Sequence, residues 1–220
     1  DLDKTALGAR GRNAHTIDRA RLLAVRRTVA GLLGSAFDRA AFEAAYEQLN
    51  RVEFHPFTRD NQDYLAYICL ILGSGLFEAE QVIAGVRAGQ LTTVEAFMAR
   101  VDRRVDALEP ALAEIHRDIY ALVLAGDPTP FKPFRRNEYL STVERMGHLP
   151  DDAPVETLLA EEILITQEVR ALALDWRRRG ALLFGLSDKP DEASIPTPEL
   201  AARGYQPIHR AESHAVGRAG

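Results

Sequence analysis

The chain has 220 residues, 46% of them hydrophobic and 27% charged, which is typical of a globular protein with one core, or one core and a second lobe. Its formal net charge is −5 and it has no basic block, so we expect neither a nucleic-acid partner nor an anionic membrane. The longest apolar run, 66–72, is too short to cross a bilayer. The single cysteine, Cys69, lies in that run, which predicts a buried thiol and a cytoplasmic location.

Helical periodicity dominates the first part of the chain. After a turn rich in glycine and arginine, we expect helices over 16–33, 38–50 and 61–72. The third of these is almost wholly apolar, which predicts a central, buried helix. Three more helices are expected at the end of this part, over 76–88, 93–108 and 111–124.

The remainder of the chain is less regular. Three prolines within six residues of the segment 126–140 predict an ordered loop rather than a helix or a strand. The continuously hydrophobic run 181–187 predicts a parallel strand that is covered on both faces. The other expected elements are helices, over 138–146, 155–179 and 198–203.

Two short motifs contain the candidate chemistry. Residues 1–5 have the pattern Asp-x-Asp-x-Thr, and residues 187–190, at the end of the predicted strand, read Ser-Asp-Lys-Pro. On an extended segment, residues two apart point to the same side, so one carboxylate could attack while the other donates a proton. A hydroxyl at the tip of a second parallel strand could hold a phosphate oxygen beside them.

These motifs, with a long helical stretch between them, resemble those of the haloacid dehalogenase (HAD-like) superfamily of aspartate-nucleophile phosphohydrolases. The resemblance implies an α/β fold, mostly helical by count, with a partial Rossmannoid core formed by residues 1–14 and 151–220. Residues 15–150 would form a large α-helical cap domain. It also implies a Mg²⁺-dependent phosphatase that acts on a small phosphorylated substrate.

The resemblance implies roles for individual residues. Asp1 would be the nucleophile and form an aspartyl-phosphate, Asp3 would be the general acid/base, and both would hold Mg²⁺. Further candidates for contacts with an anionic substrate are two arginines beside the first motif, a lysine in the proline-rich loop, and Arg135 and Arg136 next to that lysine. Solvated surface charges would look the same in the sequence. The candidate substrate-binding residues are Thr5, Ser187, Asp188, Lys189, Arg10, Arg12 and Lys132.

Lysine is rare in this chain, with three residues against 24 arginines. A coding bias produces such a ratio, yet Lys4 and Lys189 lie inside the two motifs, where one ammonium group would have to reach one oxygen. The alternative for Lys189 is that it only shapes a turn, and for Lys132 that it is simply exposed.

Two features depart from the family pattern. The family has a buried strand before the first motif, whereas Asp1 is the first residue here, so we expect the chain to be truncated or processed. The family also has a lysine and acidic residues downstream of the serine motif, and no further lysine follows Pro190. Lys132 or Lys189 could supply the missing positive charge.

Two other classes of function therefore remain open. One is a degenerate HAD-like protein that binds an anion or a protein without turnover. The other is a mainly helical interaction module whose acidic motif is accidental, which predicts no cleft between residues 1–5 and 187–189. The six histidines show no metal-binding signature, so we expect them on the surface or in loops.

Overall fold

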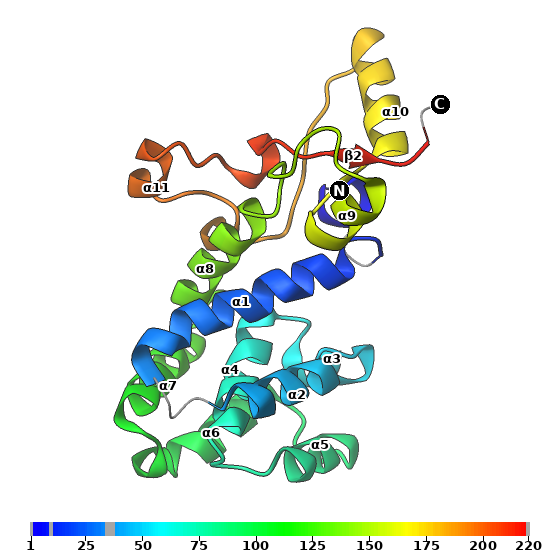
Figure 1. Ribbon diagram of the computed structural model, residues 1–220. Coiled ribbons are helices and arrows are strands. Elements are labelled where there is room, and N and C mark those ends of the chain that lie inside the picture. Colours follow the sequence, from blue (N-terminus) through cyan, green and yellow to red (C-terminus); the bar gives the residue numbers. More distant parts are fainter. Residues whose placement is uncertain (1, 9–10, 34–37, 219–220) are drawn as a thin grey trace. The chain divides into compact units, whose positions relative to one another are not determined.

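The computed structural model describes residues 2–8, 11–33 and 38–218. This part of the chain is mostly helical, as the sequence predicted, and contains one pair of short strands (Figure 1). Strands β1 (Ile165–Thr166) and β2 (Ala215–Val216) run parallel, with Ile165 opposite Ala215. The described residues form no larger sheet than this pair.

The chain divides into two compact units. The first consists of 1–24 and 135–220, and the second of 25–134. The chain passes between them within helix α1 (Ala14–Leu33) and again within helix α8 (Lys132–Val143). Much of α1 and α8 therefore belongs to the first unit, whereas the sequence placed both helices in the cap.

In the described part of the second unit, all the regular elements are helices. The unit is built around α4, whose residues are buried from Asp63 to Gly73. This is the central helix that the apolar sequence predicted. Asp38 and Thr93 cap α2 and α6, because each side chain accepts a hydrogen bond from a backbone N–H three residues later. The elements are α2 (Arg39–Leu49), η3 (Val52–Phe54), α3 (His55–Thr58), α4 (Gln62–Gly73), α5 (Ala79–Arg87), α6 (Val94–Asp102), η4 (Val105–Ala107) and α7 (Pro110–Leu124).

Aromatic side chains fill the core of the second unit. The Phe97 ring centroid lies 5.7 Å from that of Phe77 and 6.3 Å from those of Phe57 and Tyr67. Cys69 is fully buried on α4, and burial raises the pKa of its thiol. The buried cysteine that the sequence predicted is confirmed, and a protonated, enclosed thiol is a poor nucleophile.

The first unit joins the two ends of the described chain. Its core contains Leu7, Ile17, Tyr139, Met146, Ile163 and Ile208, which come from five separate stretches of sequence. Besides the parts of α1 and α8 already mentioned and the two strands, its elements are η1 (Leu2–Ala6), α9 (Val155–Glu161), α10 (Gln167–Arg178), η5 (Asp191–Ala193), α11 (Pro198–Ala202) and η6 (Ile208–Arg210).

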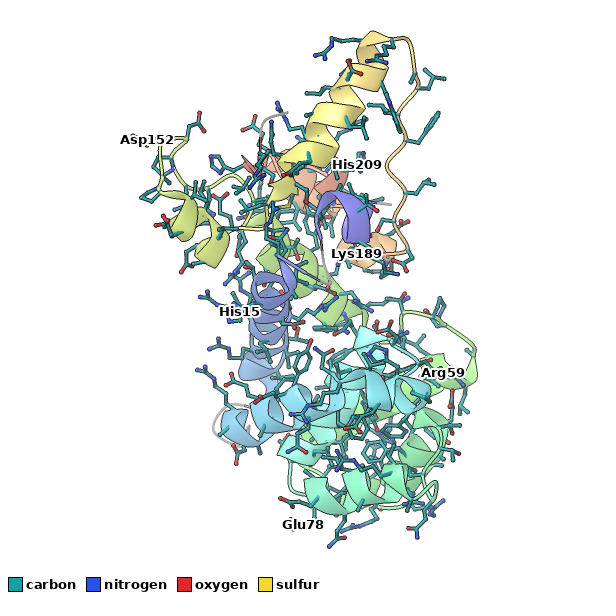
Figure 2. The ribbon with its side chains drawn as sticks, turned by 90° about the vertical axis from the view of Figure 1, so that its right-hand side faces the viewer. His15, Arg59, Glu78, Asp152, Lys189 and His209 are labelled. Carbon is teal, nitrogen blue, oxygen red and sulfur yellow. The ribbon has the colours of Figure 1, made fainter. Side chains whose placement is uncertain are left out.

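The strand expected over 181–187 is absent, and that prediction was wrong. The segment is irregular, and the residues Leu182, Phe184 and Leu186 are 82%, 78% and 71% exposed. In Figure 2 it descends from α10 to Lys189 with its side chains pointing into open space. A buried parallel strand needs hydrogen-bonded neighbours and cover on both faces. In the described residues the second half of this segment has a single backbone–backbone hydrogen bond, from the Leu2 N–H to the Leu186 oxygen at 2.7 Å.

Three other expectations need correction. The first motif is one turn of π-helix, η1, rather than an extended segment. The helix expected over 155–179 is interrupted between α9 and α10, because Ile163 and Leu164 leave the helix and are completely buried. Helix α8 begins inside the proline-rich segment, since Pro133 lies in its first turn, where a missing N–H costs nothing.

A helix that spans a bilayer needs roughly 20 predominantly apolar residues. None of the helices in the described ranges meets this requirement.

Candidate functional site

The two sequence motifs are in contact in the first unit. The Ser187 hydroxyl donates a hydrogen bond to the Asp3 carboxylate, and the backbone N–H of Leu2 donates to the Leu186 carbonyl at 2.7 Å. Asp3 is buried, with 8% of its surface exposed. The motifs therefore meet as the sequence predicted, although neither of them is a strand.

Ser187 also shapes its own loop. Its hydroxyl oxygen accepts a hydrogen bond from the backbone N–H of Lys189 at 3.1 Å. A serine that accepts from the residue two positions later forms a compact turn. The hydroxyl thus joins Asp3 on one side to the start of the Lys189 turn on the other.

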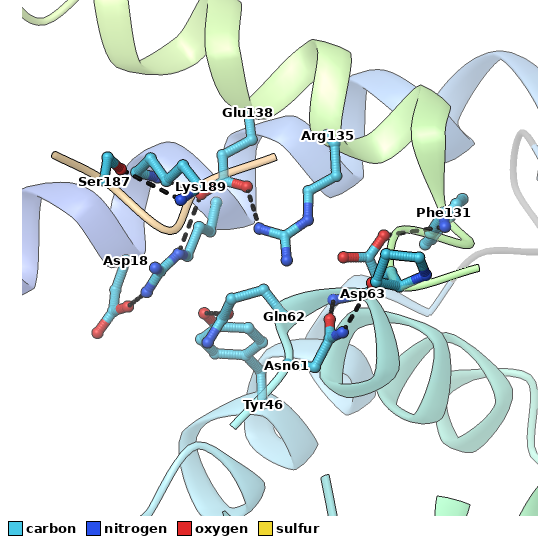
Figure 3. Close-up of polar contacts among 12 residues, drawn as sticks. Asp18, Tyr46, Asn61, Gln62, Asp63, Phe131, Arg135, Glu138, Ser187 and Lys189 are labelled. Carbon is cyan, nitrogen blue, oxygen red and sulfur yellow. Dashed lines mark hydrogen bonds and ion pairs between the residues drawn. The ribbon is translucent and has the colours of Figure 1, made fainter. Parts of the chain in front are cut away.

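The Lys189 side chain points to a buried carboxylate on α8. Its Nζ lies 3.2 Å from Oε1 of Glu138, whose side chain is only 1% exposed (Figure 3). Two arginines bind the same carboxylate: Arg135 Nη1 at 2.7 Å from Oε2, and Arg21 Nε at 3.3 Å from Oε1. Arg21 also donates to Asp18 at 3.1 Å.

Charge decides the ionisation of Glu138. Burial alone would raise the pKa of this carboxyl, but Lys189, Arg135 and Arg21 together hold it well below its usual range. Glu138 is therefore an anion at neutral pH in spite of its burial. Such a buried charge is stable only when every partner stays in place.

Sequence reasoning missed Glu138 and Arg21, and considered Arg135 only as a contact for an anionic substrate. Arg135 and Glu138 lie one turn apart on α8, yet the proline-rich segment concealed the start of that helix. Arg21 lies on α1, 117 residues from Glu138. The only signal in the sequence was the scarcity of lysine, which singled out Lys189 but not its partner.

Of the six other predicted site residues, the structure describes four. Thr5 and Asp188 are exposed in the first unit, and Arg12 donates a hydrogen bond to the Val216 carbonyl. Lys132 belongs to the second unit, where its Nζ pairs with Asp127 at 2.8 Å. Asp1 and Arg10 lie outside the described residues.

Of the two acids expected to hold Mg²⁺, the structure describes only Asp3. One oxygen of its carboxylate already accepts the Ser187 hydrogen bond. Within residues 2–8, 11–33 and 38–218, no group of three or more histidine, cysteine or acidic side chains could hold a metal ion.

A second polar cluster in the first unit surrounds Glu162, whose side chain is completely buried. Its Oε1 accepts hydrogen bonds from the backbone N–H groups of His148 and Leu149 at 2.8 and 2.7 Å. Its Oε2 lies 2.7 Å from Nδ1 of His214, and Nε2 of His214 lies 3.2 Å from Asp151. Because both ring nitrogens of His214 face a carboxylate, only the imidazolium form makes both hydrogen bonds.

This geometry predicts a pH-dependent contribution to stability. The bonds to Glu162 and Asp151 raise the pKa of His214, and the bonds from His214, Leu149 and His148 lower the pKa of Glu162 in spite of its burial. The histidine contribution is complete below about pH 6.5, the ordinary value, and is lost as the pH rises through the folded pKa. The glutamate contribution is complete above about pH 4.3 and is lost as the pH falls.

We therefore expect the stability difference between the wild type and His214→Gln to be largest between about pH 4.3 and 6.5 and to shrink at higher pH. Urea unfolding at a series of pH values measures it. His209→Gln is the matched control, because His209 is an exposed histidine of the same segment. A His214→Gln difference that does not change with pH would contradict the prediction.

Comparison with known proteins assigns no family to this chain. It matches no protein-family model, no curated protein and no solved structure. Its function must be inferred from the contacts described above and from the two motifs.

Proposed function

We propose that the protein is a HAD-like, Mg²⁺-dependent phosphatase that hydrolyses a small phosphate ester through an aspartyl-phosphate on Asp1. The observation that supports this most directly is the hydrogen bond from Ser187 to Asp3, which joins two motifs 184 residues apart. An accidental acidic motif gives no reason for the second motif to meet it.

In this proposal the reaction has two displacements. A carboxylate oxygen of Asp1 attacks phosphorus, the P–O bond to the leaving group breaks, and Asp3 donates its proton to the leaving oxygen. Asp3 then takes a proton from a water molecule, whose oxygen attacks the aspartyl-phosphate and releases phosphate and the free carboxylate. Each step leaves Asp3 in the protonation state that the next one requires.

The contacts of the second motif suit this chemistry. The Ser187 hydroxyl and the Lys189 ammonium come from a single turn, and both can donate hydrogen bonds to phosphoryl oxygens. The Ser187 bond also fixes the orientation of the Asp3 carboxylate, so the proton donor is already oriented before the substrate binds. Lys189 would take the place of the downstream lysine of the family.

Magnesium is part of the proposal, and its ligands would be Asp1 and Asp3. When bound, it would screen the charges of the carboxylates and the phosphoryl group. Of these two acids, the described residues include only Asp3.

A non-catalytic HAD-like protein that binds an anion is the second candidate. The observation that favours it is the engagement of both key side chains: Asp3 bonds to Ser187, and Lys189 bonds to Glu138. This alternative keeps the anion-binding role of Ser187 and Lys189 and predicts no turnover.

Hydrolysis of a generic aryl phosphate in the presence of Mg²⁺ tests the proposal. The wild type should release phosphate, and Asp1→Asn should abolish the release because the nucleophile is lost. Asp152→Asn, in an exposed loop of the first unit (Figure 2), should leave the rate unchanged. If the wild type hydrolyses no small phosphate ester, the non-catalytic candidate replaces the proposal.

A further inference from the structure

We infer that Glu138 is a positioning residue that holds the Lys189 ammonium beside the Ser187 turn. The inference rests on the proposed role of that turn in binding a phosphoryl group. Glu138 is not part of either motif and was not predicted from the sequence. It acts through Lys189 and touches none of the reacting groups itself.

The first step of the argument is that Lys189 is fixed at both ends. Its backbone N–H donates to Ser187, and its Nζ donates to Glu138 at 3.2 Å. A lysine side chain has four rotatable bonds, so an ammonium without a partner would sample many positions around the turn. The Glu138 carboxylate selects one of them.

The second step is that Glu138 itself cannot move freely. Arg135 holds one of its oxygens from the same helix, and Arg21 holds the other from α1. The side chain is 1% exposed, so water offers the carboxylate no alternative partners. The position of the Lys189 ammonium is thus determined by residues of α1 and α8, in addition to its own loop.

The third step concerns charge. Three cations share the single negative charge of Glu138, so this carboxylate neutralises Lys189 only in part. The Lys189 side chain keeps 16% exposure, and an ammonium has three donors, of which Glu138 needs one. Lys189 is therefore held in place and can still donate to a phosphoryl oxygen.

The scarcity of lysine makes the inference directly testable. The chain has three lysines, so a lysine-selective acylating reagent read by peptide mass spectrometry reports each of them separately. Lys4 is exposed, and the Lys132 side chain is 42% exposed in its pair with Asp127. In the wild type we expect Lys189 to react about tenfold more slowly than Lys132, because its charged hydrogen bond and burial must be broken first.

Glu138→Gln keeps the shape of the side chain and removes its charge. It should accelerate the labelling of Lys189 about tenfold and leave Lys4 and Lys132 unchanged. Asp127→Asn is the matched control, because it removes the acidic partner of Lys132 and should accelerate that lysine alone. Glu138→Asp covers the case in which the glutamine variant does not fold, since it keeps the buried charge but withdraws it from Nζ, and should give intermediate labelling of Lys189.

Turnover provides the second readout. If Glu138 acts through Lys189, Glu138→Gln should lower kcat/KM when it is the only substitution. It should have no further effect in the Lys189→Met background. Independent losses that add up in the double variant would overturn the positioning role. So would a wild type in which Lys189 is labelled as fast as Lys132.

Failure of the inference and failure of the proposed function give different results. Protected Lys189 that becomes reactive in Glu138→Gln, in a protein without phosphatase activity, supports the positioning role and removes the catalytic one. Active enzyme in which Lys189 is labelled freely removes the positioning role and leaves the phosphatase intact.

Discussion

Asp3→Asn is expected to lower the rate of aryl phosphate hydrolysis by about 10²- to 10⁴-fold, the usual cost of losing a general acid/base. The amide keeps the shape of the carboxylate and can still accept the Ser187 hydrogen bond, so the contact between the two motifs survives. It cannot deliver a proton to the leaving oxygen or take one from water. The loss should therefore appear in kcat.

A leaving group of low pKa gives this prediction a second readout. Such a leaving group departs without protonation, so the first displacement in Asp3→Asn should recover with activated esters, while release from the aspartyl-phosphate stays slow. Rapid-mixing measurements that follow the burst of the leaving group and the release of phosphate separately distinguish the two steps. Equal loss of both steps for every ester would show that Asp3 is not the proton donor.

Ser187→Ala is the comparison for Asp3→Asn. If the hydroxyl binds substrate and transition state equally, this change mainly raises the Michaelis constant. Because Ser187 also orients Asp3, a part of the loss should reach kcat. A fall in kcat as large as that of Asp3→Asn would mean that the hydroxyl serves chiefly to place the acid.

Much of the helical framework could be predicted because its signals are local. The apolar run of α4, the cap residues Asp38 and Thr93, and Pro110 at the first position of α7 each determine structure within a few residues of themselves. The prediction failed where a proline-rich stretch concealed the start of α8, because proline breaks a helix interior but suits a helix start.

The strand expected over 181–187 failed for a different reason. Its composition is typical of a buried strand. A strand is stable only when neighbouring strands pair with it, and the local sequence does not show whether they exist. In the described residues one backbone–backbone hydrogen bond, from Leu2, reaches this segment's second half, and Leu182 and Phe184 remain exposed. The hydrophobicity of the segment is therefore compatible with a strand, but it carries no information about whether neighbouring strands are present.

In the candidate site, too, some contacts could be predicted from the sequence and others could not. Asp3 and Ser187 could be paired in advance because each belongs to a motif with a defined chemistry. The partners of Lys189 and His214 could not, since Glu138 is 51 residues from Lys189 and Glu162 is 52 residues from His214. Apart from Arg135, one turn before Glu138 on α8, the side chains that bind these two buried carboxylates come from distant parts of the sequence.

Glu162→Ala is expected to lower the free energy of unfolding by about 3–5 kcal/mol, the usual cost of removing one partner from a buried charge pair. The change leaves the N–H groups of His148 and Leu149 without their acceptor and leaves His214 with Asp151 alone. It also empties the space of a completely buried side chain. Denaturant unfolding near pH 6, where both members of the pair are charged, measures the loss.

The adjacent Glu161→Ala is the matched control. Glu161 is 49% exposed and its nearest cation, Arg19, lies 3.8 Å away, so its removal should change stability by less than about 0.5 kcal/mol. Both substitutions remove one negative charge from the same turn of the chain, and only burial and hydrogen bonding distinguish them. Equal effects would show that Glu162 stabilises the first unit through net charge. A loss confined to Glu162→Ala would show that its bonds to His148, Leu149 and His214 hold the 148–151 loop and the β2 segment together.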